Sequence, residues 1–219
     1  ALGHGSGQDT VSMADGQPQV EELTAYLDGL ARPGAAVSAV EVVVADPQQI
    51  RFRHAAGYRV GGERLQPGAR FDAASLTKPW MATLALVLDR ARLLPLELEL
   101  RDIFPAAKRR GADVSLEDLL RHRSGIVAWV PLGLRLGKRL ADRTDFADFL
   151  FSESLWPQVD APRGALSPYS DLGYILWGLA AERVTGRSLA DLLDAHVAEP
   201  LGLAPLGALA ARPPAEEIV

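Results

Sequence analysis

The chain has 219 residues, a formal net charge of −5 and an apolar content of 48%, which is enough for a folded globular core but offers no basic stripe for nucleic acid. It has no cysteine, so disulfides and thiolate chemistry are excluded, and its four histidines lie far apart, which predicts no metal centre and no cofactor. No apolar run reaches about 18 residues without a charge, so we expect no membrane span.

Residues 1–16 are small, polar and rich in glycine, and we expect them to be a disordered lead-in or an expression remnant. Met13 could be a native start within this segment. The sequence shows no signal peptide, and this favours a cytoplasmic location over export.

The next segment predicts one helix followed by a β-hairpin. Residues 17–32 carry apolar side chains at helical spacing and end at Pro33-Gly34. Two strands rich in β-branched residues are expected on either side of Asp46-Pro47. A lone hairpin is only marginally stable and leaves its edges open. We therefore expect the helices to cover it, or further strands to follow residue 219.

From Ser75 onward the pattern is helical, with glycine, proline and serine marking the gaps. The sequence thus predicts four parts: the lead-in at 1–16, a helix-and-strand part at 17–74, a helical part at 75–203, and at 204–219 the start of a segment leading to further strands. A short basic run, KRR at 108–110, is expected to be solvated surface. The helices are expected at 75–92, 115–122, 145–155, 171–185 and 188–198.

Ser75 and Lys78 lie at the start of the first of these helices, three residues apart, so that their side chains can touch. A lysine amine activates a serine hydroxyl if burial lowers the pKa of the amine toward neutrality. The helix N-terminus would also place backbone N–H groups near a developing oxyanion. The alternative is that Ser75 caps the helix and Lys78 is a solvated first-turn residue.

The expected helix at 171–185 begins at Asp171, and Tyr169 lies just before it. The apolar face of this helix fixes the position of both residues. Asp171 suits a helix N-cap, and Tyr169 suits an aromatic at the boundary of the core.

Taken together, Ser75-Leu76-Thr77-Lys78 and the later YSDLGY at 169–174 resemble the serine β-lactamase and penicillin-binding-protein superfamily. The branch they resemble most holds class C β-lactamases, D-alanyl-D-alanine peptidases and esterases. LEDLLRHRSGI at 116–126 is similar to the helix and His-x-Ser-Gly turn that the family carries between these motifs. The resemblance implies an α/β (α+β) fold, with an antiparallel sheet flanked by helices and packed on a mainly helical region.

The resemblance also implies roles for single residues. Ser75 would be the acylated nucleophile, Lys78 its proton-accepting partner and Tyr169 a second general acid/base, which requires the charge of Lys78 to lower the tyrosine pKa. Asp171 would bind substrate at a place where the family has asparagine. A carboxylate only accepts hydrogen bonds, so this departure favours esters over lactams or peptides.

Trp129, in the loop at 127–144, is expected to line the acyl pocket, and ordinary surface packing is the alternative. His122 is expected to stabilise a turn at a helix end through hydrogen bonds rather than to react.

The family's third motif, Lys-Thr-Gly or His-x-Gly on a sheet strand, is not found after residue 171. Arg123-Ser124-Gly125 fits it loosely but precedes the tyrosine motif. We therefore expect this chain to be one part of a larger hydrolase, completed by a C-terminal segment or a separate companion chain.

The sequence predicts a serine hydrolase that acts through an acyl-enzyme on a small ester, a β-lactam or a D-amino-acid peptide. Two alternatives in the same family stay open. One is a relative that binds such ligands without turnover, and the other is a fragment active only with its companion. A helical scaffold with coincidental motifs is the remaining alternative.

Overall fold

The computed structural model describes residues 17–35, 37–108, 113–125 and 169–205. They belong to two compact units, one running to Ala74 and the other beginning at Ser75. The predicted helix at 145–155, the loop at 127–144 with Trp129, and the end of the chain lie outside the described residues.

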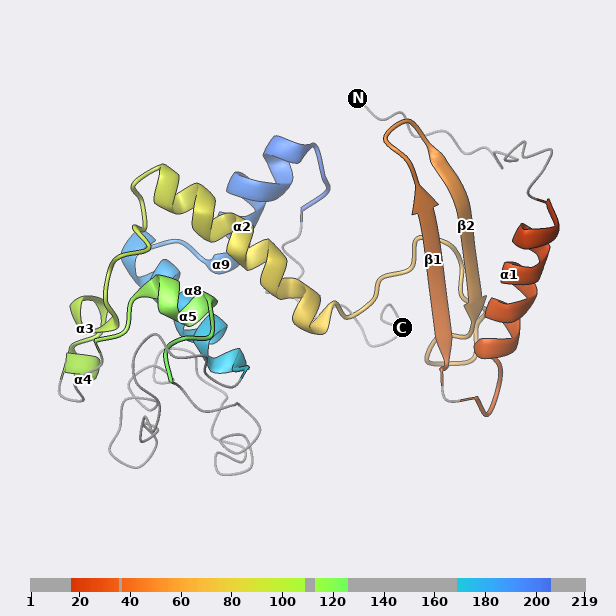
Figure 1. Ribbon diagram of the computed structural model, residues 1–219, viewed down its shortest axis with the longest axis horizontal. Coiled ribbons are helices and arrows are strands. Elements are labelled where there is room, and N and C mark those ends of the chain that lie inside the picture. The colour runs from red at the N-terminus through yellow and green to blue at the C-terminus, as the bar shows by residue number, and fades with distance from the viewer. Residues whose placement is uncertain (1–16, 36, 109–112, 126–168, 206–219) are drawn as a thin grey trace. The chain divides into compact units, whose positions relative to one another are not determined.

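The first unit holds helix α1 (Gln17–Leu30) and a hairpin of strands β1 (Ala39–Ala45) and β2 (Ile50–Gly57), as the sequence predicts. The strands are antiparallel and pair Ala39 with Gly57 at one end and Ala45 with Ile50 at the other. Helix α1 lies beside β2 (Figure 1). The helix is thus the element that covers this hairpin within the described part of the unit.

Local chemistry fixes the two ends of the hairpin. At the turn, the Asp46 carboxylate accepts hydrogen bonds from the backbone N–H groups of Gln48 and Gln49, each at 2.8 Å. At the other end Gly57 has a φ of 95°. A side chain there would meet the carbonyl oxygen of Ser38 at 2.2 Å, so only glycine fits.

The second unit is helical. Its longest helices are α2 (Thr77–Arg90) and α8 (Asp171–Thr185), and the shorter ones are α3 (Leu100–Ile103), α4 (Pro105–Lys108), α5 (Leu116–Leu120) and α9 (Leu189–Leu193). Helix α9 continues into the π-helical turn η3 (Asp194–Ala198) and the 3-10 turn η4 (Glu199–Leu201). The sequence predicted α2, α5, α8 and α9 but missed α3 and α4, each four residues long.

The core of this unit is formed by side chains from α2, α3, α4, α5, α8, α9 and η3. Trp177, at the centre of α8, is fully buried. Removing such apolar surface from water is the main stabilising term in a fold of this kind. The core includes the fully buried leucines Leu84, Leu88, Leu94, Leu100, Leu116, Leu119, Leu172, Leu176, Leu192 and Leu193.

Helix α8 approaches α5 closely at a glycine. A side chain at Gly173 would meet the carbonyl oxygen of Leu119 at 2.7 Å, so the absence of a Cβ lets the two helices touch. Helix α5 itself begins with a capping box. The Ser115 hydroxyl accepts from the backbone N–H of Asp118, and the Asp118 carboxylate reaches back to the backbone N–H of Ser115. These features set the start of α8 against the end of α5.

Candidate active site

Ser75 lies in the 3-10 turn η1 (Ala74–Leu76), immediately before α2 begins at Thr77. The predicted contact with Lys78 is present: the Lys78 Nζ donates a hydrogen bond to the Ser75 Oγ at 3.2 Å. Ser75 is exposed, so its hydroxyl is accessible. The turn and the first residues of α2 therefore present a serine and an ammonium side by side.

Tyr169 completes the contacts of the serine from a distant part of the chain. Its hydroxyl donates to the Ser75 Oγ at 2.7 Å. Its ring lies 4.6 Å from the Lys78 Nζ, which is the range of a cation–π contact. The Ser75 oxygen thus accepts hydrogen bonds from both a phenol and an ammonium, and each of these groups can exchange a proton with it.

The fourth residue of the site is Asp171, whose Oδ1 lies 2.5 Å from the Lys78 Nζ. This contact joins the first turn of α8 to the first turn of α2. The N-cap position of α8 belongs to Ser170, and the side chain of Asp171 pairs with the lysine. The alternative role of Asp171, that of capping α8, is therefore wrong.

The pKa of Lys78 is raised above its ordinary value of 10.5. Burial lowers this pKa, since the side chain is only 14% exposed, but hydrogen bonds to Asp171 and Tyr169 and the negative charge of Asp171 outweigh burial. The expectation that burial brings the amine toward neutrality is thus wrong. Of the apolar neighbours expected around it, Leu76 is 71% exposed and Trp80 is 36% exposed. Lys78 is an ammonium at neutral pH.

The pKa of Tyr169 is lowered below its ordinary value of 10.0, as the sequence argument required. The hydrogen bond to Lys78 is the largest cause, and the hydrogen bond to Ser75 and the positive charge of Lys78 act in the same direction. Burial and the charge of Asp171 oppose the shift. Of the two groups that contact Ser75, Tyr169 is therefore the one whose pKa is shifted toward neutrality.

His122 lies in the turn that follows α5 and contacts this group through Tyr169. Its Nδ1 accepts a hydrogen bond from the backbone N–H of Ser170 at 3.2 Å. Its ring centroid lies 4.7 Å from that of Tyr169 and 5.6 Å from that of Tyr174. The sequence predicted hydrogen bonding by His122 at a turn, but not that its partner is the start of α8.

The structure therefore brings Ser75, Lys78, Tyr169 and Asp171 together, and Trp129 falls outside the described residues. The family model described as Beta-lactamase matches residues 21–214. The chain belongs to the Beta-lactamase family. The predicted family is thereby confirmed.

Two curated relatives illustrate the range of this Beta-lactamase family. The chain is 33% identical over 220 residues to "Esterase EstB" of Burkholderia gladioli, covering 93% of this chain and 55% of the relative. It is 28% identical over 167 residues to "Penicillin-binding protein 4*" of Bacillus subtilis (strain 168), covering 74% of this chain and 36% of the relative. The chain thus spans about half or less of the length of these relatives.

Solved structures share the Beta-lactamase-like fold. "EstCE1, a hydrolase with promiscuous acyltransferase activity" matches with a TM-score of 0.68 at 20% identity, over 86% of this chain and 52% of that one. A D-amino acid amidase from Ochrobactrum anthropi SV3 matches with a TM-score of 0.66 at 24% identity, over 83% of this chain and 49% of that one. The predicted fold, helices with a small antiparallel sheet, is confirmed.

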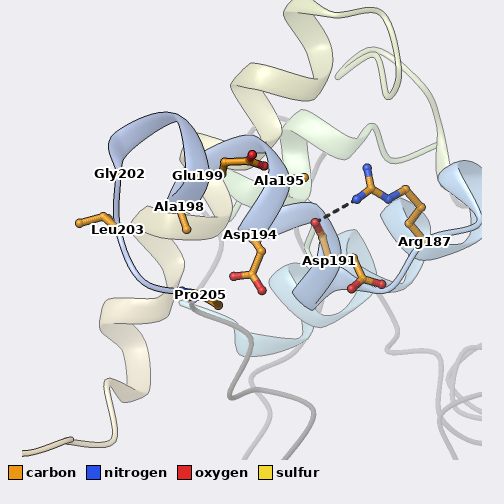
Figure 2. Close-up of a pocket in the computed structure, with 9 residues that line it drawn as sticks. All are labelled: Arg187, Asp191, Asp194, Ala195, Ala198, Glu199, Gly202, Leu203 and Pro205. Carbon is orange, nitrogen blue, oxygen red and sulfur yellow. Dashed lines mark hydrogen bonds between the residues drawn. The ribbon is translucent and has the colours of Figure 1, made fainter. Parts of the chain in front are cut away.

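A separate groove of about 590 Å³ lies in the same unit of this Beta-lactamase-family chain, along α9, η3 and η4 (Figure 2). The Arg187 guanidinium donates to the carbonyl oxygen of Asp191 at 3.2 Å at its edge. None of the four residues of the candidate site lines it. Its lining consists of Arg187, Asp191, Asp194, Ala195, Ala198, Glu199, Gly202, Leu203 and Pro205.

Among the residues that the structure describes, no group of three or more His, Asp or Glu side chains is placed to hold a metal ion. In the same part of the chain, no helix combines the length and the apolar character that crossing a bilayer requires.

Proposed function

We propose that the protein is a serine hydrolase that forms an acyl-enzyme at Ser75, with esters as its favoured substrates. The observation that carries this proposal is the Ser75 Oγ, which lies 2.7 Å from the Tyr169 hydroxyl and 3.2 Å from the Lys78 Nζ. A serine hydroxyl needs a neighbouring base before it attacks a carbonyl. Both neighbours are within the distance at which a proton is transferred.

Tyr169 is the base in this scheme and Lys78 is the cation. Burial acts to lower the pKa of Lys78, but the pairing with Asp171 acts in the opposite direction and the pKa is raised overall. The amine therefore keeps its proton. The pKa of Tyr169 is lowered, chiefly by hydrogen bonding to Lys78, so its phenolate is populated at lower pH than that of an ordinary tyrosine. The Lys78 ammonium thus stabilises the Tyr169 phenolate beside the serine.

The reaction then proceeds in two steps. The Tyr169 phenolate takes the proton of Ser75 while the Oγ forms a bond to the ester carbonyl carbon. The bond from that carbon to the alcohol oxygen breaks, and the alcohol leaves with the proton from Tyr169. Water next attacks the acyl-enzyme, Tyr169 takes a proton from the water, and this proton returns to Ser75 as the acid departs.

Asp171 supports esters as the substrate class. A carboxylate offers no donor to the amide oxygen of a lactam or peptide, and its charge disfavours substrates that carry a carboxylate near the scissile bond. Its side chain is 41% exposed, so a bound substrate would meet this charge. The relatives named as an esterase and as an amidase agree with acyl transfer as the reaction type.

The second candidate function is ligand binding by the same fold without turnover. The observation that favours it is the pairing of Lys78 with Asp171, which removes the amine from the set of available bases. In this case Ser75 would form at most a stable adduct. The two candidates differ in whether product appears.

The test combines labelling with turnover. The purified protein and its Ser75→Ala variant are incubated with an alkyl fluorophosphonate, which loses fluoride as the serine oxygen bonds to phosphorus, and the intact mass is recorded. A p-nitrophenyl ester then measures turnover. A Ser75 adduct together with Ser75-dependent turnover supports the hydrolase. An adduct without turnover supports the binding function, and no adduct contradicts both a working nucleophile and the proposal.

A further inference from the structure

We infer that His122 is a positioning residue, which holds the Tyr169 phenol against Ser75 through the backbone of Ser170 and through ring contact. This inference rests on the proposed function. It assigns to the His-x-Ser-Gly turn a part in the reaction, beyond the turn stabilisation expected from the sequence.

The first support is the backbone that carries Tyr169. Ser170 is 3% exposed and has an extended conformation, with φ −138° and ψ 124°, directly before α8. Its N–H donates to the His122 Nδ1 at 3.2 Å. A buried N–H must be satisfied, because leaving it without a partner costs much of its desolvation free energy. The histidine therefore fixes the peptide unit that links Tyr169 to Ser170.

The second support is the ring contact. The His122 ring lies 4.7 Å from the Tyr169 ring with an interplanar angle of 33°. On its other side it lies 5.6 Å from the Tyr174 ring. The Tyr174 hydroxyl in turn donates to the carbonyl oxygen of Leu120 at 3.1 Å, which ties α8 back to α5. The Tyr169 side chain is 52% exposed, so this contact restrains a ring that would otherwise have few neighbours.

The third support is the conformation of His122 itself. Its φ is 55°, in the left-handed region that residues with a Cβ rarely adopt. This conformation turns the chain after α5, where the N–H of His122 donates to the carbonyl oxygen of Leu119. Such backbone strain persists where the surrounding structure holds it, and it concentrates at functional sites.

The hydrogen bond to Ser170 also fixes the protonation state that His122 must have. Nδ1 accepts only when the ring is neutral with its proton on Nε2, since both nitrogens of an imidazolium are donors. Among the described residues, the titratable groups that face the ring are Lys78 from α2, Tyr169 from the segment before α8, and Asp171 and Tyr174 from α8. Burial and then the charge of Lys78 lower the pKa of His122, and together they outweigh the opposing charge of Asp171. The ring is therefore neutral at neutral pH.

Two variants separate the acceptor from the ring. His122→Asn keeps an acceptor atom near the place of Nδ1 and loses the ring, whereas His122→Phe keeps a ring and loses the acceptor. His54→Asn, at a histidine of the first unit that contacts Asp28, is the matched control. For each purified protein, active sites are titrated with the fluorophosphonate, and kcat and KM for a p-nitrophenyl ester are measured from pH 5 to 9.

The expected result is a fall in kcat per titrated site of about 10- to 100-fold in H122F, with KM little changed, because a small misplacement of a reacting group has effects of this order. H122N is expected to lose less. Below the lowered pKa of His122, the wild-type kcat falls more steeply with decreasing pH than that of H122N, whose amide does not titrate. A merely structural histidine would change the number of active sites and the thermal midpoint, but not kcat per site.

Equal kcat per titrated site in the wild type and both variants would overturn the inference while leaving the proposed function intact. If H122F does not fold, H122N decides alone: an acid limb as steep as that of the wild type would overturn the inference. If the wild type itself shows no Ser75 adduct, the proposed function fails, and the role of His122 fails with it.

Discussion

The Lys78 Nζ and the Asp171 Oδ1 lie 2.5 Å apart and join two helices whose first residues are far apart in the sequence. The pair determines what each partner can do. Lys78 remains an ammonium, because the pairing outweighs the effect of burial on its pKa. Asp171 in turn has one carboxylate oxygen paired with Lys78, while its side chain stays 41% exposed, so the negative charge that a substrate meets is reduced but not removed.

We predict that Asp171→Asn moves both limbs of the pH–rate profile to lower pH. The ascending limb follows the Tyr169 phenolate, whose pKa is lowered chiefly by Lys78 and raised by the charge of Asp171, so removing that charge lowers it further. The descending limb follows loss of the Lys78 proton. Its pKa falls because burial is then less opposed. The profile of kcat/KM for a neutral ester measures both limbs.

A profile of D171N that is unmoved, or moved to higher pH, would contradict this account of the pair. Asp191→Asn is a suitable control, since Asp191 lines the separate groove and its carboxylate accepts from Ser188. It is expected to leave the profile unchanged.

We predict that Tyr169→Phe lowers kcat by about 10²- to 10⁴-fold, the range associated with loss of a general base. The variant removes the hydroxyl that contacts the Ser75 Oγ and keeps the ring beside His122. KM should change little. Tyr26→Phe is the control, because Tyr26 is 64% exposed on α1. A Y169F protein with wild-type kcat for the p-nitrophenyl ester would show that another group takes the serine proton.

Local sequence patterns were sufficient to predict much of the fold. The bounds expected for α8 agree with the structure, because its apolar residues repeat at helical spacing and a glycine in the left-handed conformation ends it at Gly186. The hairpin was predicted from β-branched runs around Asp46. Helices α3 and α4 were missed because four residues are too few to establish a period, and their positions depend on packing in the core.

The sequence predicts which residues form the site, but not the protonation states of those residues. Spacing alone places Ser75 beside Lys78, and resemblance adds Tyr169. The proton affinity of Lys78 depends on a carboxylate 93 residues away, and no local pattern reports such a contact. For the same reason the contact between His122 and Ser170, 48 residues apart, could not be read from the turn motif.

We predict that Gly173→Ala destabilises the protein, whereas Gly178→Ala does not. A Cβ at Gly173 would lie 2.7 Å from the backbone oxygen of Leu119, and such overpacking typically costs about 1–3 kcal/mol. At Gly178 the nearest atoms are the side-chain ends of Leu189 and Met81 at 3.3 and 3.4 Å, which can move. Alanine is also favoured in helices over glycine by about 1 kcal/mol. Urea unfolding of the two variants measures the difference, and equal stabilities would contradict the close contact of α5 and α8.

We predict that Ser115→Ala lowers the free energy of unfolding by about 1–2 kcal/mol, the upper part of the range for a lost N-cap. The Ser115 hydroxyl accepts from the N–H of Asp118 and also donates to its carboxylate, and both residues are buried. Ser188→Ala removes the same kind of cap from α9 at an exposed position, so we expect a smaller loss. Thermal or urea unfolding ranks the two variants. A larger loss in S188A would show that burial does not decide the cost.

The hydrogen bond between Tyr169 and Ser75 closes a loop of 94 residues. Contacts of such large sequence separation carry an entropic cost of loop closure and are associated with slow folding. We therefore predict that the reactive serine acquires its base only after α2, α5 and α8 have packed together. The rate at which Ser75 becomes reactive toward a fluorophosphonate during refolding would therefore report the rate of the final folding step of this unit.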